Sequence, residues 1–469
     1  MVDALIVSSG TIISASLASA LVICSLAVLG CSSKDRTTIL LVTDEEAGTF
    51  TRVPAPTTLR VDALEFTGDG GTQTVTLSRT KWPASTLDLG WIDESTTGVL
   101  TVWGLDMSGS VVVYGASPPL TFGNIANGTI SVFVQRTGEF ARLPNPLSDS
   151  RQAPTLAVLQ GRYLFVGAGN TPIEPDASFA GTTQLYDFLA MAPIAAPPTL
   201  PRVPESIALD GTVSWLMDAE GGTYFGFSDD YVGAISLPSG SFADVAGGAT
   251  ITDENGAEYV VAATRTMGLA SAKVLKIDPN DSSNSSYPYG NPSWLMLAQA
   301  RLGAAATWVT GRGLVVAGGA TSGAGIEIVA AGTTAGIALP YPADSSTGSG
   351  AAMLDASHVL LAGGLTPTGA DAGVRVVDLG CAAGCSPTPW PGLTTPLIRA
   401  QVFVGGDGAN LLVVGSEPAT GITHVYRLSS SAATEIPTRM THVNARAAVS
   451  PTGTVVLFGG AATIESFTP

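Results

Sequence analysis

Short runs of apolar residues, separated by clusters of glycine, serine, threonine and proline, follow one another along most of the chain. Runs of this length with turn residues at both ends predict β-strands. Apolar residues make up 45% of the chain and charged residues only 13%, so few charges are present to form the paired patterns of exposed helices. The pattern therefore predicts an all-β protein.

One unit of this pattern recurs roughly every 50 residues. Its clearest copy, residues 301–329, contains an arginine, a strand of small residues, a turn, an apolar strand that ends in two glycines, and a third strand. Other apolar strands that end in glycine lie at residues 98–104, 162–169, 358–364, 410–415 and 454–460, with weaker copies at 212–217 and 258–263. This self-similarity predicts a fold that stacks copies of one supersecondary unit.

The unit resembles the kelch family of β-propellers, including its galactose-oxidase-like branch. The resemblance is carried by Gly-Gly doublets, by an arginine before the first strand, and by Tyr186-Asp187 or Val377-Asp378 in the third strand. It covers residues 151–469 well and residues 38–150 loosely. It implies one propeller of four-stranded blades, seven or eight in number, over residues 38–469. A β-solenoid or a string of β-sandwiches is the alternative.

The resemblance gives the repeated residues a structural role. We expect the doublet glycines to allow close backbone approach or a positive φ, as glycine can; they are Gly318, Gly319, Gly363, Gly364, Gly459 and Gly460. We expect Arg301 and Arg399 to brace their blades. Because the chain continues only briefly after the last apolar strand, we expect residues 38–52 to supply the outer strand of the last blade and close the ring, which removes exposed strand edges.

The first thirty residues predict a signal segment. No charged residue occurs between Ala4 and Cys31, and this stretch is apolar or small throughout. Val28-Leu29-Gly30-Cys31 resembles the lipobox of bacterial lipoprotein precursors, which implies cleavage before Cys31, a lipid on its thiol and, with Ser32 next, sorting to the outer membrane. Residues 31–37 then form a short tether. The alternative is an uncleaved signal anchor. Under either hypothesis the rest of the chain is exported.

The charged residues, the cysteines and the histidines limit which ligands and metal sites we expect. The net charge of −17 argues against nucleic-acid binding, which requires a basic surface. Cys381 and Cys385 predict a disulfide in an exported protein, because a metal site would need two further ligands nearby. His358, His424 and His442 fall at three different places in the repeat. We therefore expect surface histidines and no clustered copper or other metal site.

The sequence shows no motif that assigns catalytic, cofactor-binding or metal-binding residues, so we expect a non-enzymatic module. Its partner would be a protein or a polysaccharide, bound by loops at the blade ends. We expect a monomer that contacts the membrane only through its lipid anchor. The alternative is a secreted carbohydrate-active enzyme, a hydrolase or an oxidase, with its site at the channel mouth. A catalytic pair of carboxylates need not form a sequence motif, because the pair is brought together by the fold. A purely structural envelope component is a third hypothesis.

Overall fold

The computed structural model describes residues 37–469 with gaps at 45–47, 68–70, 85, 91–92, 127, 170–181, 196–199, 201–203, 211–212, 227–230, 238–240, 262–269, 280, 282–289, 406–410 and 451. The predicted signal segment, the lipobox with Cys31 and most of the tether lie outside the described residues. The described elements are β-strands and two short 3-10 helices, Phe122–Asn124 and Phe242–Asp244, which confirms the all-β prediction. Within these ranges, no helix has the length and apolar character to cross a bilayer.

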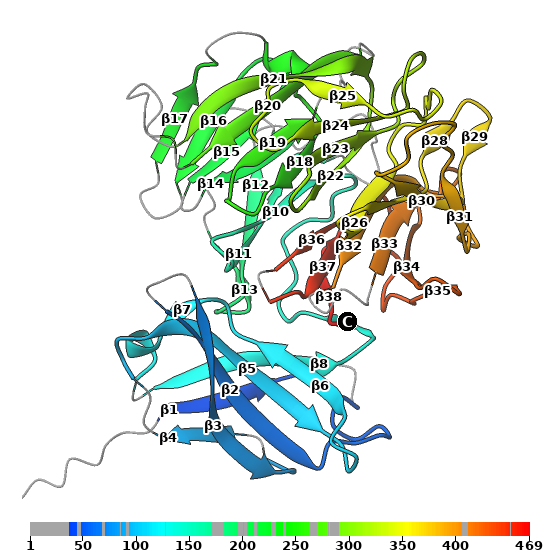
Figure 1. Cartoon of the computed structure of the whole chain (residues 1–469). Helices are drawn as coiled ribbons and strands as arrows, with labels where there is room; N and C mark the ends of the chain where they lie inside the picture. Colours follow the sequence, from blue (N-terminus) through cyan, green and yellow to red (C-terminus); the bar gives the residue numbers. More distant parts are fainter. Residues whose placement is uncertain are drawn as a thin grey trace, which may run out of the picture. The chain divides into compact units, whose positions relative to one another are not determined.

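Seven four-stranded antiparallel sheets make up a β-propeller (Figure 1). Blade 1 holds β10 (Thr155–Leu159), β11 (Tyr163–Gly167), β12 (Thr183–Asp187) and β13 (Ala192–Pro193); blade 2 holds β14 (Ser206–Asp210), β15 (Val213–Met217), β16 (Gly222–Gly226) and β17 (Tyr231–Ile235). Blade 3 holds β18 (Ala249–Thr252), β19 (Glu258–Val261), β20 (Ser271–Asp278) and β21 (Asn291–Arg301); blade 4 holds β22 (Ala305–Val309), β23 (Gly313–Ala317), β24 (Ile326–Ala330) and β25 (Gly336–Ala338).

The remaining blades keep this order with two additions. Blade 5 holds β26 (Gly350–Asp355), β27 (His358–Ala362), β30 (Val374–Asp378) and β31 (Thr388–Trp390), with a hairpin of β28 (Leu365–Thr366) and β29 (Gly369–Ala370) between its second and third strands. Blade 6 holds β32 (Ile398–Val404), β33 (Leu411–Ser416), β34 (Thr423–Leu428) and β35 (Ala433–Glu435). Blade 7 holds β36 (Arg446–Val449), β37 (Val455–Phe458), β38 (Glu465–Phe467) and, out of chain order, β9 (Phe140–Arg142).

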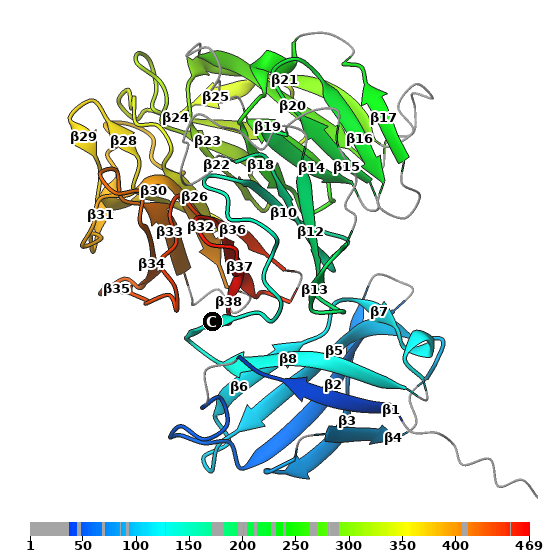
Figure 2. The same ribbon diagram turned by 180° about the vertical axis from the view of Figure 1, so that it is seen from behind.

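The first strand of each blade contacts the first or second strand of its neighbours, and β36 contacts β10, so the blades close into a ring (Figure 2). Small side chains occupy the crowded inner strands, as in the buried pair Ala305 and Ala306 of β22. Apolar clusters between adjacent sheets form the core; one joins Val316 of blade 4 to Val261 of blade 3. A single blade cannot bury both of its faces, so this stacking stabilises all seven.

The strand that closes the ring is not the predicted one. We expected residues 38–52, but β9 pairs with β38 instead, with Phe140 opposite Phe467. The Phe140 and Phe467 rings lie 5.1 Å apart between centroids, and both side chains are fully buried. Directly before β9, the Gln135 side-chain amide donates a hydrogen bond to the Ser466 carbonyl oxygen at 3.2 Å. Closure therefore joins the start of the propeller to its end.

Residues 37–136 differ from the expected single propeller, because they form an eight-stranded sheet of their own. Its strands are β1 (Thr37–Val42), β2 (Thr58–Phe66), β3 (Thr72–Lys81), β4 (Thr86–Gly90), β5 (Thr97–Leu105), β6 (Val111–Ala116), β7 (Leu120–Thr121) and β8 (Thr129–Arg136). β1 pairs in parallel with β8 and buries Ile39 in this sheet's own core, which is why it cannot serve blade 7. The candidate eighth repeat at residues 98–104 is β5, so the propeller has seven blades.

The glycine doublets lie where one blade meets the next. All six doublet glycines have positive φ. The second glycine of each doublet donates its backbone N–H to a carbonyl oxygen of the following blade: Gly319 to Ser346 at 2.7 Å, Gly364 to Leu397 at 2.8 Å, and Gly460 to Arg151 at 2.6 Å. A Cβ on Gly319 would lie 2.6 Å from the Leu302 carbonyl oxygen. Glycine therefore gives both the backbone angle and the room that the contact needs.

Gly319→Ala should lower the free energy of unfolding by roughly 3 kcal/mol, since the side chain meets backbone atoms as well as a strained φ. Gly332→Ala is the matched control, because Gly332 has φ +77° with nothing within 4 Å of a Cβ; it should cost about 1 kcal/mol. Denaturant unfolding of the two variants measures the difference. Equal losses would show that the second glycine is not needed for close packing.

Candidate functional site

The arginine of the clearest repeat is a structural brace. Arg301 is fully buried and donates to the carbonyl oxygens of Gly318 at 2.6 Å, Ala324 at 2.8 Å and Gly325 at 2.8 Å. Its Nε and one terminal nitrogen also donate to Glu327 of β24, at 3.1 and 2.8 Å. One side chain thereby fixes the loop after the second strand to the third strand.

Glu327 completes this brace on the other side. Its carboxylate accepts the backbone N–H groups of Ala298 at 2.5 Å and Gln299 at 3.0 Å, near the end of β21. Blade 1 repeats the arrangement with Arg151, which donates to the Ala168 carbonyl oxygen at 3.3 Å, and with Gln184, which accepts from the Ser148 N–H at 2.8 Å. A buried charge needs such partners, because an unpaired one is costly.

His442 has the same place in blade 7, which corrects our expectation of a surface histidine. Its side chain is fully buried, with Nδ1 3.0 Å from the Gly459 carbonyl oxygen and Nε2 3.3 Å from Glu465. Glu465 accepts the N–H groups of Arg439 at 2.9 Å and Met440 at 2.7 Å, as Glu327 does in blade 4. The ring therefore lies between the doublet loop and the third strand of blade 7, as the Arg301 side chain does in blade 4.

Arg399 does not brace blade 6, which corrects the second expected role. The brace position lies two residues earlier and is held by Leu397, a fully buried side chain whose carbonyl oxygen accepts from Gly364. Arg399 is exposed, has φ +54° and lies at the mouth of the central channel. The brace position holds arginine in blades 1 and 4, leucine in blade 6 and histidine in blade 7, which explains why its spacing was hard to follow in the sequence.

Arg301→Leu should lower the free energy of unfolding by about 3–5 kcal/mol, because Glu327 would stay buried without its cationic partner. Arg301→Leu combined with Glu327→Gln should recover part of that loss. The second change removes the lone charge and keeps the acceptor for the backbone N–H groups, as Gln184 does in blade 1. Denaturant unfolding compares the two; no recovery in the double variant would contradict a charge-based brace.

Around the channel, six blades share one backbone conformation at the start of the first strand. The residue there has positive φ, and the set comprises Ala153, Gly247, Gly303, Gly348, Arg399 and Asn444. Backbone hydrogen bonds join neighbouring members: the Gly348 N–H donates to the Gly303 carbonyl oxygen at 2.8 Å, and the Ala153 N–H to that of Asn444 at 2.7 Å. The mouth is therefore a rigid rim of backbone from which a few side chains project.

A cavity of about 610 Å³ lies inside this rim. Its described lining is glycine, alanine, serine and threonine for the most part, with three charged side chains: Glu205 in blade 2, Arg399 in blade 6 and Arg446 in blade 7. No aromatic side chain and no histidine belongs to this described lining. The volume lies within the range of small-ligand sites, although those are usually more apolar. Its surface matches a polar ligand with many hydroxyl groups.

The arginine side of the rim is tied together. The Gln401 side chain forms a two-point contact with Ala447 of the next blade, donating to its carbonyl oxygen at 3.1 Å and accepting its N–H at 2.9 Å. The Arg446 guanidinium donates to the Arg399 carbonyl oxygen at 3.1 Å. These contacts fix the two arginine-bearing strands relative to each other.

The other titratable residues that we singled out do not join this site. His358 pairs with Asp355 at 2.9 Å, and His424 pairs with Glu435 at 2.7 Å, in different blades. Within the described ranges, no group of three histidine, cysteine or acidic side chains is placed to hold a metal ion. These residues therefore do not fit a copper centre made from clustered histidines.

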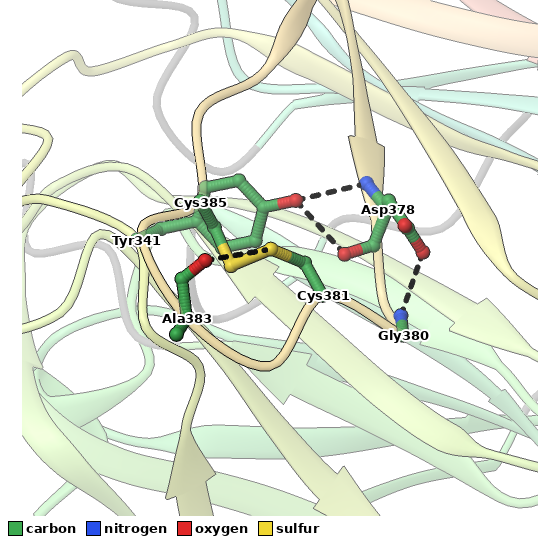
Figure 3. Close-up of a disulfide and its surroundings, with 6 residues drawn as sticks. All are labelled: Tyr341, Asp378, Gly380, Cys381, Ala383 and Cys385. Carbon is green, nitrogen blue, oxygen red and sulfur yellow. Dashed lines mark hydrogen bonds between the residues drawn. A yellow bond between two sulfur atoms is a disulfide. The ribbon is translucent and has the colours of Figure 1, made fainter.

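Cys381 and Cys385 form a disulfide in the turn between β30 and β31 (Figure 3). Cys385 is buried against Tyr341, whose hydroxyl donates to the Asp378 carbonyl oxygen at 2.8 Å and accepts its N–H at 3.0 Å. The Asp378 carboxylate accepts the Gly380 N–H at 2.7 Å. The bridge fixes an outer connection of blade 5 and is not part of the channel lining.

No protein-family model matches the chain, and no curated protein matches it. Similar solved structures include a fungal alcohol oxidase of the AA5 family in complex with copper, with TM-score 0.49 and 14% identity over 71% of this chain and 76% of that chain. A chain of the mitotic checkpoint complex has TM-score 0.43 and 10% identity, over 71% and 95%. The Pan2 WD40 domain of Neurospora crassa has TM-score 0.43 and 13% identity, over 70% and 94%. This likeness concerns the fold alone.

The channel residues did not stand out in the sequence. Arg399 was expected to brace its blade, Arg446 belonged to the repeated arginines before a first strand, and Glu205 had no expected role. The signal was the spacing: Arg399 stands two residues after the brace position, where Gly303 and Gly348 stand in blades 4 and 5. An arginine in a place that other repeats fill with glycine is a departure that the scaffold itself does not require.

Proposed function

We propose that the protein is an exported kelch-type propeller lipoprotein that binds polysaccharide at the mouth of its central channel. The observation that carries this proposal is the lining of the 610 Å³ cavity, which is rich in backbone, hydroxyl and charged groups and has no aromatic side chain among its described residues. Protein interfaces use aromatic anchors at their centres, whereas a polyhydroxylated ligand is matched by polar donors and acceptors.

The same lining supports binding over glycoside hydrolysis. Glycoside hydrolysis generally uses two carboxyl groups on either side of the bond that is cleaved. Glu205 is the one carboxylate among the described residues that line the mouth. A rigid rim with one acid and two arginines is suited to holding a saccharide, and we therefore assign the protein a binding role.

Export is the second part of the proposal, and the disulfide supports it. Disulfides such as Cys381–Cys385 persist in oxidising compartments and are rare in the cytosol. Together with the lipobox resemblance at Cys31, this supports a location of the propeller outside the cytoplasm. The lipid on Cys31 would anchor it at the outer membrane, with the channel mouth free to meet extracytoplasmic glycans.

Screening the full-length protein in detergent against a polysaccharide and glycan array should identify at least one ligand. Thr250→Trp, which fills the mouth, should reduce that binding at least tenfold with an unchanged Tm. Thr310→Trp is the matched control, because Thr310 is exposed in the turn that leaves β22 at its other end, and it should bind as the wild type does. No glycan ligand, or full binding by Thr250→Trp, would contradict the proposal.

Cys31→Ala should abolish lipid attachment, because the thiol is the acceptor. Expressed in a Gram-negative host, the variant should keep the larger precursor size and leave the outer-membrane fraction, and globomycin should make the wild-type precursor accumulate. Fractionation and immunoblotting measure both effects. A variant with unchanged size and membrane association would contradict the lipoprotein assignment and favour an uncleaved anchor.

A further inference from the structure

The charges of the channel mouth are divided between its two sides. Arg399 and Arg446 come from blades 6 and 7, which are adjacent, while Glu205 comes from blade 2. In a seven-membered ring, blades 2 and 6 stand apart on different sides. One wall of the cavity is therefore basic in a protein whose net charge is −17.

Arg399 has a backbone conformation that glycine adopts at three of the six equivalent positions, with Ala153 and Asn444 at the other two. Its φ of +54° is strained for a residue with a Cβ, and glycine avoids that strain at the equivalent positions of blades 3, 4 and 5. Non-glycine residues in this region gather at functional sites when the surrounding structure holds them there. Here the Ala400 N–H donates to the Gly348 carbonyl oxygen at 2.9 Å, and Arg446 holds the Arg399 carbonyl oxygen.

We propose that this wall recognises the carboxylate groups of an acidic polysaccharide, with uronic-acid residues as the ligand class. The inference rests on the proposed function and adds the charge of its ligand. Two guanidinium groups on a fixed platform can bind a carboxylate with charge-assisted hydrogen bonds, and the planar fork of arginine suits that group. The overall negative charge opposes a polyanion at a distance, so the arginines must act at contact.

The hydroxyl and backbone groups of the rim can form hydrogen bonds with the uncharged part of the sugar. Thr250 and Thr347 line the same cavity from blades 3 and 5, and Glu205 of blade 2 can accept from sugar hydroxyls. A peptide rich in aspartate would satisfy the arginines but would offer few groups to these positions. The arrangement therefore favours an acidic glycan over an acidic peptide.

Isothermal titration calorimetry of the full-length protein in detergent tests the inference with two probes of nearly equal size: trigalacturonate and its fully methyl-esterified form. Trigalacturonate should bind at least tenfold more tightly than the ester. Arg399→Gly should reduce that preference severalfold, while Tm stays the same or rises because the backbone strain is relieved. Arg446→Gln should weaken trigalacturonate binding in the same way.

Ala153→Gly is the matched control, because it relieves the same backbone conformation in blade 1 without a change in charge; its binding should equal that of the wild type. Equal binding of acid and ester, or an unaltered preference in Arg399→Gly, would overturn the charge inference and leave polysaccharide binding intact. Failure of every glycan to bind would overturn the proposed function as well. Tighter binding of a hexa-aspartate peptide than of trigalacturonate would overturn the assignment to a glycan.

Discussion

The propeller depends on a hydrogen bond between neighbouring blades, which is donated by the backbone N–H of a glycine. The second glycine of a doublet donates to the next blade, as Gly319 does to Ser346, and its positive φ turns the N–H toward that carbonyl oxygen. Such contacts join blade 4 to 5, blade 5 to 6 and blade 7 to 1. Each of these contacts holds a sheet that could not bury its faces alone. The apolar core between blades and the channel inside them both depend on this close approach of neighbouring blades.

The brace position, which Arg301 holds in blade 4, is filled by very different side chains in other blades. Arg301 and His442 meet a carboxylate from the third strand, whereas Leu397 fills the space with apolar atoms. Buried ion pairs and well-packed apolar groups are similar in net stability, provided that no charge remains alone. The repeat can therefore vary in sequence while the blade geometry stays constant, and the variation itself carries no information about ligands.

The local parts of the fold were predictable and the long-range parts were not. Glycine doublets, small inner-strand residues and a bracing Arg301 follow from the 50-residue pattern, because each acts within a blade or at its edge. The closing role of β9 and the separate sheet of residues 37–136 depend on pairings between distant segments, and Phe140–Arg142 is too short to stand out as a strand. At the site, the same repeat pattern hid Arg399, which lies two residues from the brace position that it was expected to fill.

Three charged side chains lie among the described residues of the channel mouth, where a ligand can reach them. A crystal structure of the full-length protein with bound trigalacturonate tests this account most directly. We predict the sugar inside the rim of first strands, with a carboxylate about 3 Å from the guanidinium nitrogens of Arg399 and Arg446. Density for the sugar on the outer blade surfaces, or in the channel with its carboxylates turned away from both arginines, would contradict it.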